Sequence, residues 1–200
     1  MRTRSGRLAA TTMLAAALMA TTAQAADDDG NYAVRGAGTA DCDAYRAAAA
    51  GETDGIGQFL RWFEGYITGM NRHAEDTFDQ SPVLDISVLG RSVLNLCSNE
   101  PELSFEVAVG RTLNALGPIR ERTASETRTL SHDGESVVVR DATVLRLQER
   151  LNDLGLYDGG LDGLYGPGTR RSILQYQESE DLPTSGLPDA ATLLRLLLSE

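Results

Sequence analysis

A double turn between two helical runs is the feature that most constrains the fold of this chain. The segment Asp158-Gly159-Gly160-Leu161-Asp162-Gly163 is followed closely by Gly166-Pro167-Gly168-Thr169. Aspartate and glycine tolerate positive φ, so they allow the chain to reverse direction twice within a short distance. Apolar residues at helical spacing lie on both sides of these turns. Residues 141–200 therefore predict a compact module of three short helices.

Each helix of this module has its own start and stop signals. Asp141 can cap the first helix, Gln148 lies on its inward face among leucines, and Gly155 ends it. A second helical run covers residues 170–177, and the third helix follows a loop at residues 182–189.

The residues of the module resemble the peptidoglycan-binding domain that occurs as an accessory unit on cell-wall enzymes. The matching positions, in order, are Leu147-Gln148, Leu154-Gly155, Asp162-Gly163, Gly166-Pro167-x-Thr169, Tyr176-Gln177, Leu182-Pro183 and Gly186. Asp181 departs from the family, which usually has glycine there, but aspartate can adopt the left-handed conformation and we expect the fold to survive. The resemblance implies a three-helix fold with peptidoglycan as its ligand.

The matching residues are scaffold, whereas binding needs exposed aromatic rings and polar groups that converge on a cleft. Residues around the double turn that can supply them are Tyr157, Asp162, Tyr165, Arg170 and Gln177. The alternative for each of these side chains is stabilisation of the turn or solvation of the surface. The aspartates of the double turn lack the later glutamate of a calcium loop, so we expect no metal and no cofactor.

The first 25 residues predict an export signal. Three arginines precede a mostly apolar run at residues 8–20, and small residues follow as far as Ala25. The apolar run is shorter than the roughly 20 residues that span a bilayer, which favours cleavage near Ala25 over a membrane anchor. We expect a mature protein that is periplasmic or secreted and does not span a membrane.

The charge of the mature chain restricts its partners. Removal of the three signal arginines changes the net charge from −11 to about −14. Nucleic acids and anionic membranes favour clusters of lysine and arginine, so neither is an expected partner. A mature chain of roughly 175 residues suits two small domains better than one.

The first of these domains is predicted to be a disulfide-linked helical bundle. Cys42 and Cys97 are the only cysteines, and an even number in an exported protein favours a disulfide. The aromatic residues from Phe59 to Tyr66 recur at helical spacing, which favours a packed core over a binding face. Further helical runs complete a predicted four-helix bundle: residues 41–50, residues 84–97 and a run that starts near Pro101.

Two motifs in this bundle support a second resemblance. They are Phe59-Leu60-x-Trp62-x-x-Gly65-Tyr66-x-x-Gly69-x-Asn71 and Leu96-Cys97-x-Asn99-x-Pro101. Residues 41–117 are thereby similar to the small disulfide-bonded domain of acid-activated periplasmic chaperones, the HdeA-like domain, and to related immunity proteins of type VI secretion. The resemblance implies an exported four-helix bundle with one disulfide, and the fold serves several activities.

The remaining segments are polar. Residues 26–40 are expected to form a flexible mature N-terminus, and residues 118–140 a polar linker that ends in a short extended piece. Ser131-His132-Asp133 lies in this linker, but catalytic triads are assembled by the fold rather than by neighbours in sequence. The chain is therefore predicted to be all-α, with a four-helix bundle, a three-helix module and no catalytic site.

Two functions remain open from the sequence. The first is an exported, non-catalytic envelope protein that binds peptidoglycan through its C-terminal module and places the bundle at the cell wall. The alternative is a periplasmic chaperone or immunity-type inhibitor, in which the bundle acts on a protein partner such as a wall hydrolase or a toxin. The acidic stretch at residues 75–79 would suit a basic partner.

Overall fold

The computed structural model describes residues 26–27 and 29–199, and its contacts divide the chain into two compact units between Ala33 and Val34. The predicted export signal, residues 1–25, lies outside the described residues. In the first unit, the Asp27 carboxylate accepts hydrogen bonds from the backbone N–H groups of Asp29 and Asn31.

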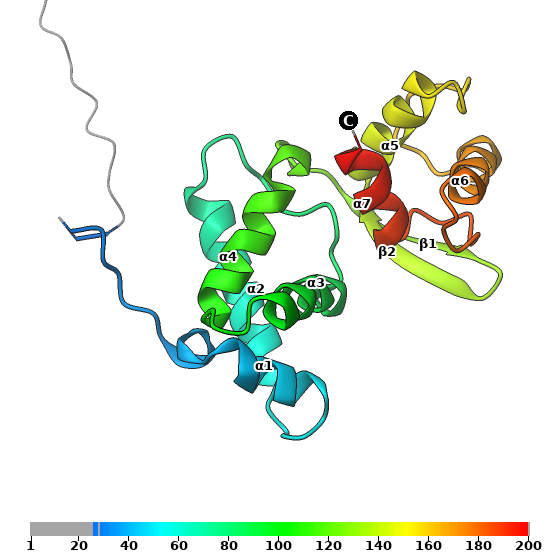
Figure 1. The fold of residues 1–200 in the computed structure, drawn as a ribbon. Helices are drawn as coiled ribbons and strands as arrows, with labels where there is room; N and C mark the ends of the chain where they lie inside the picture. The colour runs from blue at the N-terminus through cyan, green and yellow to red at the C-terminus, as the bar shows by residue number, and fades with distance from the viewer. Residues whose placement is uncertain (1–25, 28, 200) are drawn as a thin grey trace, which may run out of the picture. The chain divides into compact units, whose positions relative to one another are not determined.

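The second unit is mostly helical (Figure 1). Its elements in chain order are η1 Gly36–Thr39, α1 Cys42–Ala49, α2 Ile56–His73, α3 Ile86–Asn99, α4 Phe105–Leu116, η2 Gly117–Ile119, β1 Thr127–His132, β2 Glu135–Arg140, α5 Asp141–Asp153, α6 Pro167–Ser179 and α7 Ala190–Leu198. The all-α prediction is confirmed, with one small two-stranded sheet added to it.

Helices α1 to α4 enclose an aromatic core. The ring centroids of Tyr45, Phe59 and Phe105 lie 4.6–5.2 Å from one another, and Phe63 is wholly buried beside them. Aromatic pairs at these separations add to the stability that burial of their area provides. The aromatic run of α2 thus packs into the core, as its spacing predicted.

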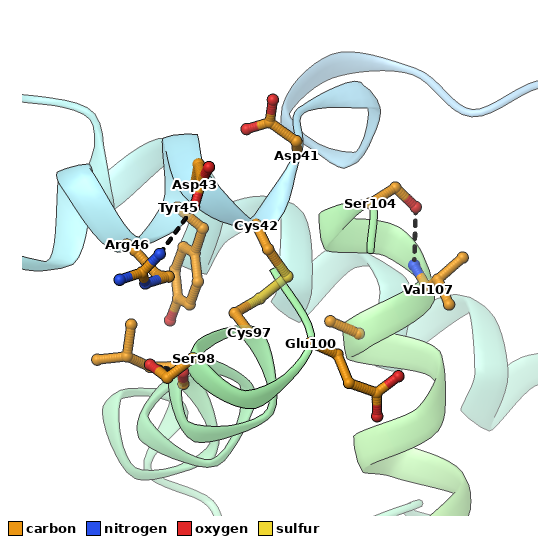
Figure 2. The surroundings of a disulfide bond; sticks show 12 residues. Asp41, Cys42, Asp43, Tyr45, Arg46, Cys97, Ser98, Glu100, Ser104 and Val107 are labelled. Atoms are coloured by element: carbon orange, nitrogen blue, oxygen red, sulfur yellow. Dashed lines mark hydrogen bonds and ion pairs between the residues drawn. A yellow bond between two sulfur atoms is a disulfide. The ribbon is translucent and has the colours of Figure 1, made fainter. Parts of the chain in front are cut away.

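The predicted disulfide is present and joins Cys42 in the first turn of α1 to Cys97 near the end of α3 (Figure 2). Both cysteines are wholly buried. Asp41 caps α1 by accepting a hydrogen bond from the backbone N–H of Ala44 at 2.8 Å. The crosslink therefore holds two helices together through cysteines that are 55 residues apart in the sequence.

Helix α4 starts later than the sequence predicted. Ser104 is its cap and accepts a hydrogen bond from the backbone N–H of Val107 at 3.3 Å, as Figure 2 shows. Pro101 lies in the turn before the helix rather than in its first turn. Phe105, at the first helical position, is wholly buried in the core, so packing sets the start of this helix.

The bundle also begins earlier than expected. Residues 36–39 of the segment predicted to be flexible form η1, and the indole N–H of Trp62 donates to the backbone carbonyl of Arg35 at 2.7 Å. A Cβ atom at Gly38 would clash with the Trp62 ring, so only glycine allows this close approach. Gly38 therefore allows the segment to pack directly against Trp62 of α2.

The second half of the predicted linker is an antiparallel hairpin of β1 and β2. Asp133 and Gly134 connect the strands with φ values of 48° and 83°. A two-residue loop with positive φ at both positions is a type I′ turn, whose twist matches that of paired strands. Leu130 and Val139 are buried against the C-terminal module, so the hairpin belongs to the core of that module.

Helices α5, α6 and α7 build the predicted C-terminal module around wholly buried aliphatic side chains. Gly155 and Asp181 follow α5 and α6 with φ values of 72° and 54°, as their positions in the sequence predicted. No helix among residues 26–27 and 29–199 is both long enough and apolar enough to cross a membrane.

Buried charges connect the bundle to the module within the second unit. Arg140 donates to the Asp79 carboxylate at 2.9 Å, and Thr143 donates to Glu121 at 2.8 Å. Asp79 and Glu121 are only 8% and 2% exposed, and their backbones pair as an isolated bridge. Removal of a partner from either carboxylate would leave a buried charge less well satisfied, which destabilises the fold.

Candidate functional site

The double turn is organised by one glutamine of α5. The side-chain oxygen of Gln148 accepts from the backbone N–H groups of Asp162 and Gly163 at 3.1 and 2.8 Å. Its amide nitrogen lies 3.0 Å from the carbonyl oxygen of Leu164 and 3.2 Å from the hydroxyl of Thr169. N–H groups face one atom of the amide and a carbonyl faces the other, so the network fixes its orientation.

A glutamine of α6 organises the next loop in the same way. The side-chain oxygen of Gln177 accepts from the backbone N–H of Gly186 at 2.8 Å. Its nitrogen donates to the carbonyl oxygen of Leu187 at 3.0 Å and to the hydroxyl of Thr192 at 2.8 Å. We call the two arrangements the first glutamine clamp (Gln148, Gly163, Leu164, Thr169) and the second glutamine clamp (Gln177, Gly186, Leu187, Thr192).

The two clamps are structural repeats. In each, a leucine directly follows a glycine of positive φ, 70° in Gly163 and 68° in Gly186. In each, a threonine at or near the start of the next helix follows six residues after the glycine. The module therefore consists of two similar helix-and-loop halves closed by α7, and its pattern residues satisfy buried backbone groups.

Two of the five predicted ligand-binding residues belong to this scaffold. Gln177 is wholly buried, and its amide is occupied within the second clamp. Tyr157 is only 8% exposed, and its hydroxyl donates to the carbonyl of Gly160 at 2.8 Å under the double turn. Neither side chain presents a free polar group at the surface.

Asp162 lies on the exposed side of the first clamp. Amide donation from Gln148 and the backbone N–H of Leu164 hold the pKa of its carboxyl below the ordinary value. A carboxylate at this position is therefore available to solvent, although one of its oxygens stabilises the turn.

Tyr165 and Arg170 are partly buried and lie near the second clamp. The Tyr165 hydroxyl donates to the carbonyl of Gly186 at 2.7 Å, and desolvation raises the pKa of this tyrosine while the Arg170 charge lowers it. A Cβ atom at Gly186 would lie 3.0 Å from Cγ of Arg170. Glycine in the loop thus leaves room for the arginine stem.

The hairpin completes a pocket around this arginine. The Arg170 guanidinium lies 2.6 Å from Nε2 of His132, the last residue of β1. The cavity beside them measures about 460 Å³ and is lined by residues of the hairpin, α6 and the loop before α7. We define the Arg170 pocket by six of its lining residues: His132, Asp133, Glu135, Arg170, Leu174 and Ser185.

The hairpin residues of this pocket were missed as site residues by the sequence reasoning. Asp133-Gly134 between alternating strand residues was the signal that could have found them, because Asp-Gly at this spacing is a strong hairpin indicator. The type I′ turn pairs His132 with Glu135 across the hairpin. Both side chains therefore reach the pocket from the same end of the sheet.

The structure gives Ser131-His132-Asp133 no triad geometry. Consecutive residues of a strand point to opposite faces, so Ser131 and His132 diverge. His132 contacts Arg170 instead, with the Asp133 carboxylate 3.3 Å away on the same ring nitrogen. Within the described ranges, no group of three or more histidine, cysteine or acidic side chains is arranged to hold a metal ion.

A larger cavity of about 720 Å³ lies elsewhere in the second unit, lined by residues of α3, β2 and the start of α7. It is mostly apolar, and none of the five predicted ligand-binding residues lines it. Of the five, Arg170 lines the smaller Arg170 pocket, and the other polar groups there come from the hairpin and from the loop before α7.

Comparison with known proteins identifies the C-terminal module. Residues 140–196 match the family model described as "Putative peptidoglycan binding domain", which confirms the resemblance drawn from the turn residues. The resemblance of residues 41–117 to acid-activated chaperones stays a prediction.

Two curated relatives share parts of the chain. The chain is 38% identical over 90 residues to the "Putative OxPP cycle protein OpcA" of Synechococcus elongatus, a match that covers 41% of this chain and 20% of the relative. It is 35% identical over 75 residues to the "Localization factor PodJL" of Caulobacter vibrioides, which covers 38% of this chain and 8% of that protein. The chain thus spans a fifth or less of these relatives, and no solved structure matches it significantly. The C-terminal segment accordingly has the fold and sequence pattern of a peptidoglycan-binding domain.

Proposed function

We propose that this protein is an exported, non-catalytic envelope protein that binds peptidoglycan through residues 140–196 and thereby places its helical bundle at the cell wall. The match of this segment to the peptidoglycan-binding family is the observation that carries the proposal. A bound module raises the effective concentration of the attached bundle at the wall without any new contact by the bundle.

Two properties of the chain support the proposed export to the cell envelope. The Cys42–Cys97 disulfide suits an oxidising compartment such as the periplasm, where such bonds persist. The N-terminal arginines, apolar run and small residues before Ala26 have the composition of an export signal.

Charge restricts how the wall is bound. The chain carries a net charge of −11, and the free carboxylates of wall peptides are also negative. General electrostatic attraction therefore does not explain adhesion, and binding must come from specific contacts of the module. Of the five predicted ligand-binding residues, Asp162, Tyr165 and Arg170 have accessible groups that can make such contacts. Contact of all five with the ligand stays a prediction.

Sedimentation with purified sacculi tests the proposal. The chain without residues 1–25 should pellet with sacculi, should not pellet with chitin, which lacks peptides, and should be displaced by soluble muropeptides. Since attraction between opposite net charges is absent, salt should weaken pelleting only as far as it screens individual ionic contacts of the module. Failure to pellet with sacculi, or equal pelleting with chitin, would contradict specific wall binding.

A shortened chain assigns the binding to the module. A version that ends at Arg140 keeps the ion pair of Arg140 with Asp79 and the backbone bridge of Asp79 with Glu121. Its helix content, checked by circular dichroism, should match that of the four bundle helices. If this version pellets as well as the longer chain, the contact lies outside residues 141–196, in the bundle or the hairpin, and the proposal is wrong.

A further inference from the structure

The Arg170 pocket combines charges of opposite sign. Arg170 is partly buried and, within the part of the chain that the structure describes, forms no ion pair with a carboxylate. Its contact is the His132 ring, which occupies one of the five guanidinium N–H groups. A partly desolvated guanidinium with free donors is suited to bind a carboxylate, often through two parallel hydrogen bonds.

The hairpin tip places negative charge at the same pocket. Asp133 and Glu135 line it, and both are exposed to solvent. A simple anion would be attracted by Arg170 and repelled by these two carboxylates. A ligand that carries an ammonium group beside its carboxylate satisfies both signs, because its cationic end can face the hairpin.

Apolar and hydroxyl groups supply the rest of the pocket. Leu174 lies on the same helix one turn after Arg170, and Ser185 precedes the glycine of the second clamp. The cavity of about 460 Å³ lies within the size range of small-molecule sites and can accept the aliphatic stem of an amino acid.

We infer that the Arg170 pocket binds a zwitterionic amino-acid group, with the ligand carboxylate on Arg170 and the ligand ammonium facing Asp133 and Glu135. The inference rests on the proposed wall binding. In the wall, such a group is the free end of a diamino acid in a stem peptide that has not been crosslinked. Two of the ionic contacts come from the hairpin at residues 127–140, which lies almost wholly outside the family match at residues 140–196.

His132 is a positioning residue in this arrangement. For Arg170 to donate to Nε2, that nitrogen must accept, so the ring proton lies on Nδ1. The same nitrogen lies 3.3 Å from the Asp133 carboxylate, a contact that requires it to donate instead. The shorter contact, at 2.6 Å, identifies His132 as the acceptor that orients the guanidinium.

Calorimetry with the chain that lacks residues 1–25 tests the inference. The probe is the tripeptide N-acetyl-L-Ala-γ-D-Glu-meso-diaminopimelate, whose one ammonium is at the free end of the diamino acid. It is compared with two blocked forms: one acetylated on that ammonium and one amidated on the carboxylate of the same carbon. Both blocked forms should bind about tenfold more weakly or worse, since each loses a charged partner. Free meso-diaminopimelate, which carries the same zwitterionic end, is a third probe and should also bind; absence of binding would overturn the assignment to that group.

Variants assign the contacts. Arg170→Gln should lose about tenfold or more in affinity and Glu135→Gln severalfold. Arg171→Gln, at an exposed arginine that does not line the pocket, is the matched control and should bind as the parent does. His132→Gln, which keeps an acceptor, should retain more affinity than His132→Leu, and all variants should keep the parent's circular dichroism spectrum.

The outcomes separate this inference from the proposed function. Equal binding of the free and blocked tripeptides, or equal affinity of Arg170→Gln and Arg171→Gln, would overturn the inference. If sacculi still pellet the Arg170→Gln chain fully, wall binding stands while this pocket is not its site. If the tripeptide binds but sacculi do not, the pocket stands and the proposed wall anchoring is wrong.

Discussion

Replacement of Gln148 by leucine tests whether the first glutamine clamp holds the module together. Leucine has a similar volume, so the substitution removes the amide without leaving a large cavity. Gly163 is buried, and its N–H loses an acceptor at 2.8 Å. The carbonyl of Leu164 keeps the Thr169 hydroxyl at 3.1 Å, and Asp162 is exposed enough for water to replace its lost contacts.

The expected loss of stability follows from these lost hydrogen bonds. One buried N–H without a partner costs about 1–3 kcal/mol, and loss of the remaining amide bonds adds about 1 kcal/mol. We therefore expect Gln148→Leu to lower the free energy of unfolding by about 2–4 kcal/mol. At about 3 °C per kcal/mol for a chain of this size, the midpoint temperature should fall by roughly 6–12 °C.

Urea and thermal unfolding followed by far-ultraviolet circular dichroism measure the change. Gln175→Leu is the matched control, because Gln175 is exposed on α6 and its replacement should change stability by less than about 0.5 kcal/mol. Amide hydrogen exchange should show faster exchange at Gly163 in Gln148→Leu. Gln177→Leu, which disrupts the second clamp, should cost a similar amount. The clamp model is refuted if Gln148→Leu and Gln175→Leu unfold at the same urea concentration.

Three further predictions concern the bundle and its junction. Alanine at both Cys42 and Cys97 opens a crosslink that spans 55 residues and should cost about 4 kcal/mol in the chain-entropy model, and an unchanged urea midpoint would contradict this. Burial raises the pKa of Tyr45 from 10.0 to about 12, so its contribution to stability should be complete below about pH 10 and fall as the pH rises to 12. Tyr45→Phe should abolish this loss of stability at high pH when unfolding is measured as a function of pH. An unchanged pH profile would show that Tyr45 does not cause the loss. Thr143→Val should cost about 1.5–3 kcal/mol by removing a hydrogen bond to the buried carboxylate of Glu121, and the exposed Thr129→Val is the control that should cost little by urea unfolding.

The helices were predictable because their apolar residues follow a 3.6-residue period. The bundle shows this in Phe59 and Phe63, which recur at helical spacing and are buried where that spacing placed them. The loops of the module were predictable for a different reason. Gly155 and Asp181 occupy positions whose positive φ few other residues tolerate, so their identity alone indicates the conformation.

The short extended piece predicted at the end of the linker is β2, but its pairing with β1 escaped prediction because burial in the hairpin is confined to few residues. Most residues of β1 are exposed and polar, and only Leu130 and Val139 among the strand residues are buried against the module. The composition of this segment therefore resembled that of a linker, and the turn signal of Asp133-Gly134 was not recognised. The pocket escaped with it, since His132 reaches Arg170 only after the type I′ turn reverses the chain.

The predicted site residues also fall into two groups: those that the structure buries in the scaffold and those that it leaves accessible. Gln177 was predicted as a ligand contact because it was expected to lie beside the double turn. In the structure it is buried and satisfies backbone groups that only the fold brings together. Asp162, Tyr165 and Arg170 kept accessible surface, and the structure adds hairpin residues beside Arg170. Residue type alone does not distinguish a buried scaffold residue from an accessible binding residue.

Arg170 lies where the two clamps meet, and this position links the fold to the proposed binding. Thr169, the last member of the first clamp, directly precedes it, and Gly186 of the second clamp leaves room for its stem. Both halves of the module thus position an arginine that forms part of neither clamp. A related chain with the same glutamines, glycines and threonines but no arginine here would fold alike and lack this charge. The pattern therefore predicts the architecture of such domains, whereas affinity depends on a few residues that the scaffold positions without needing them.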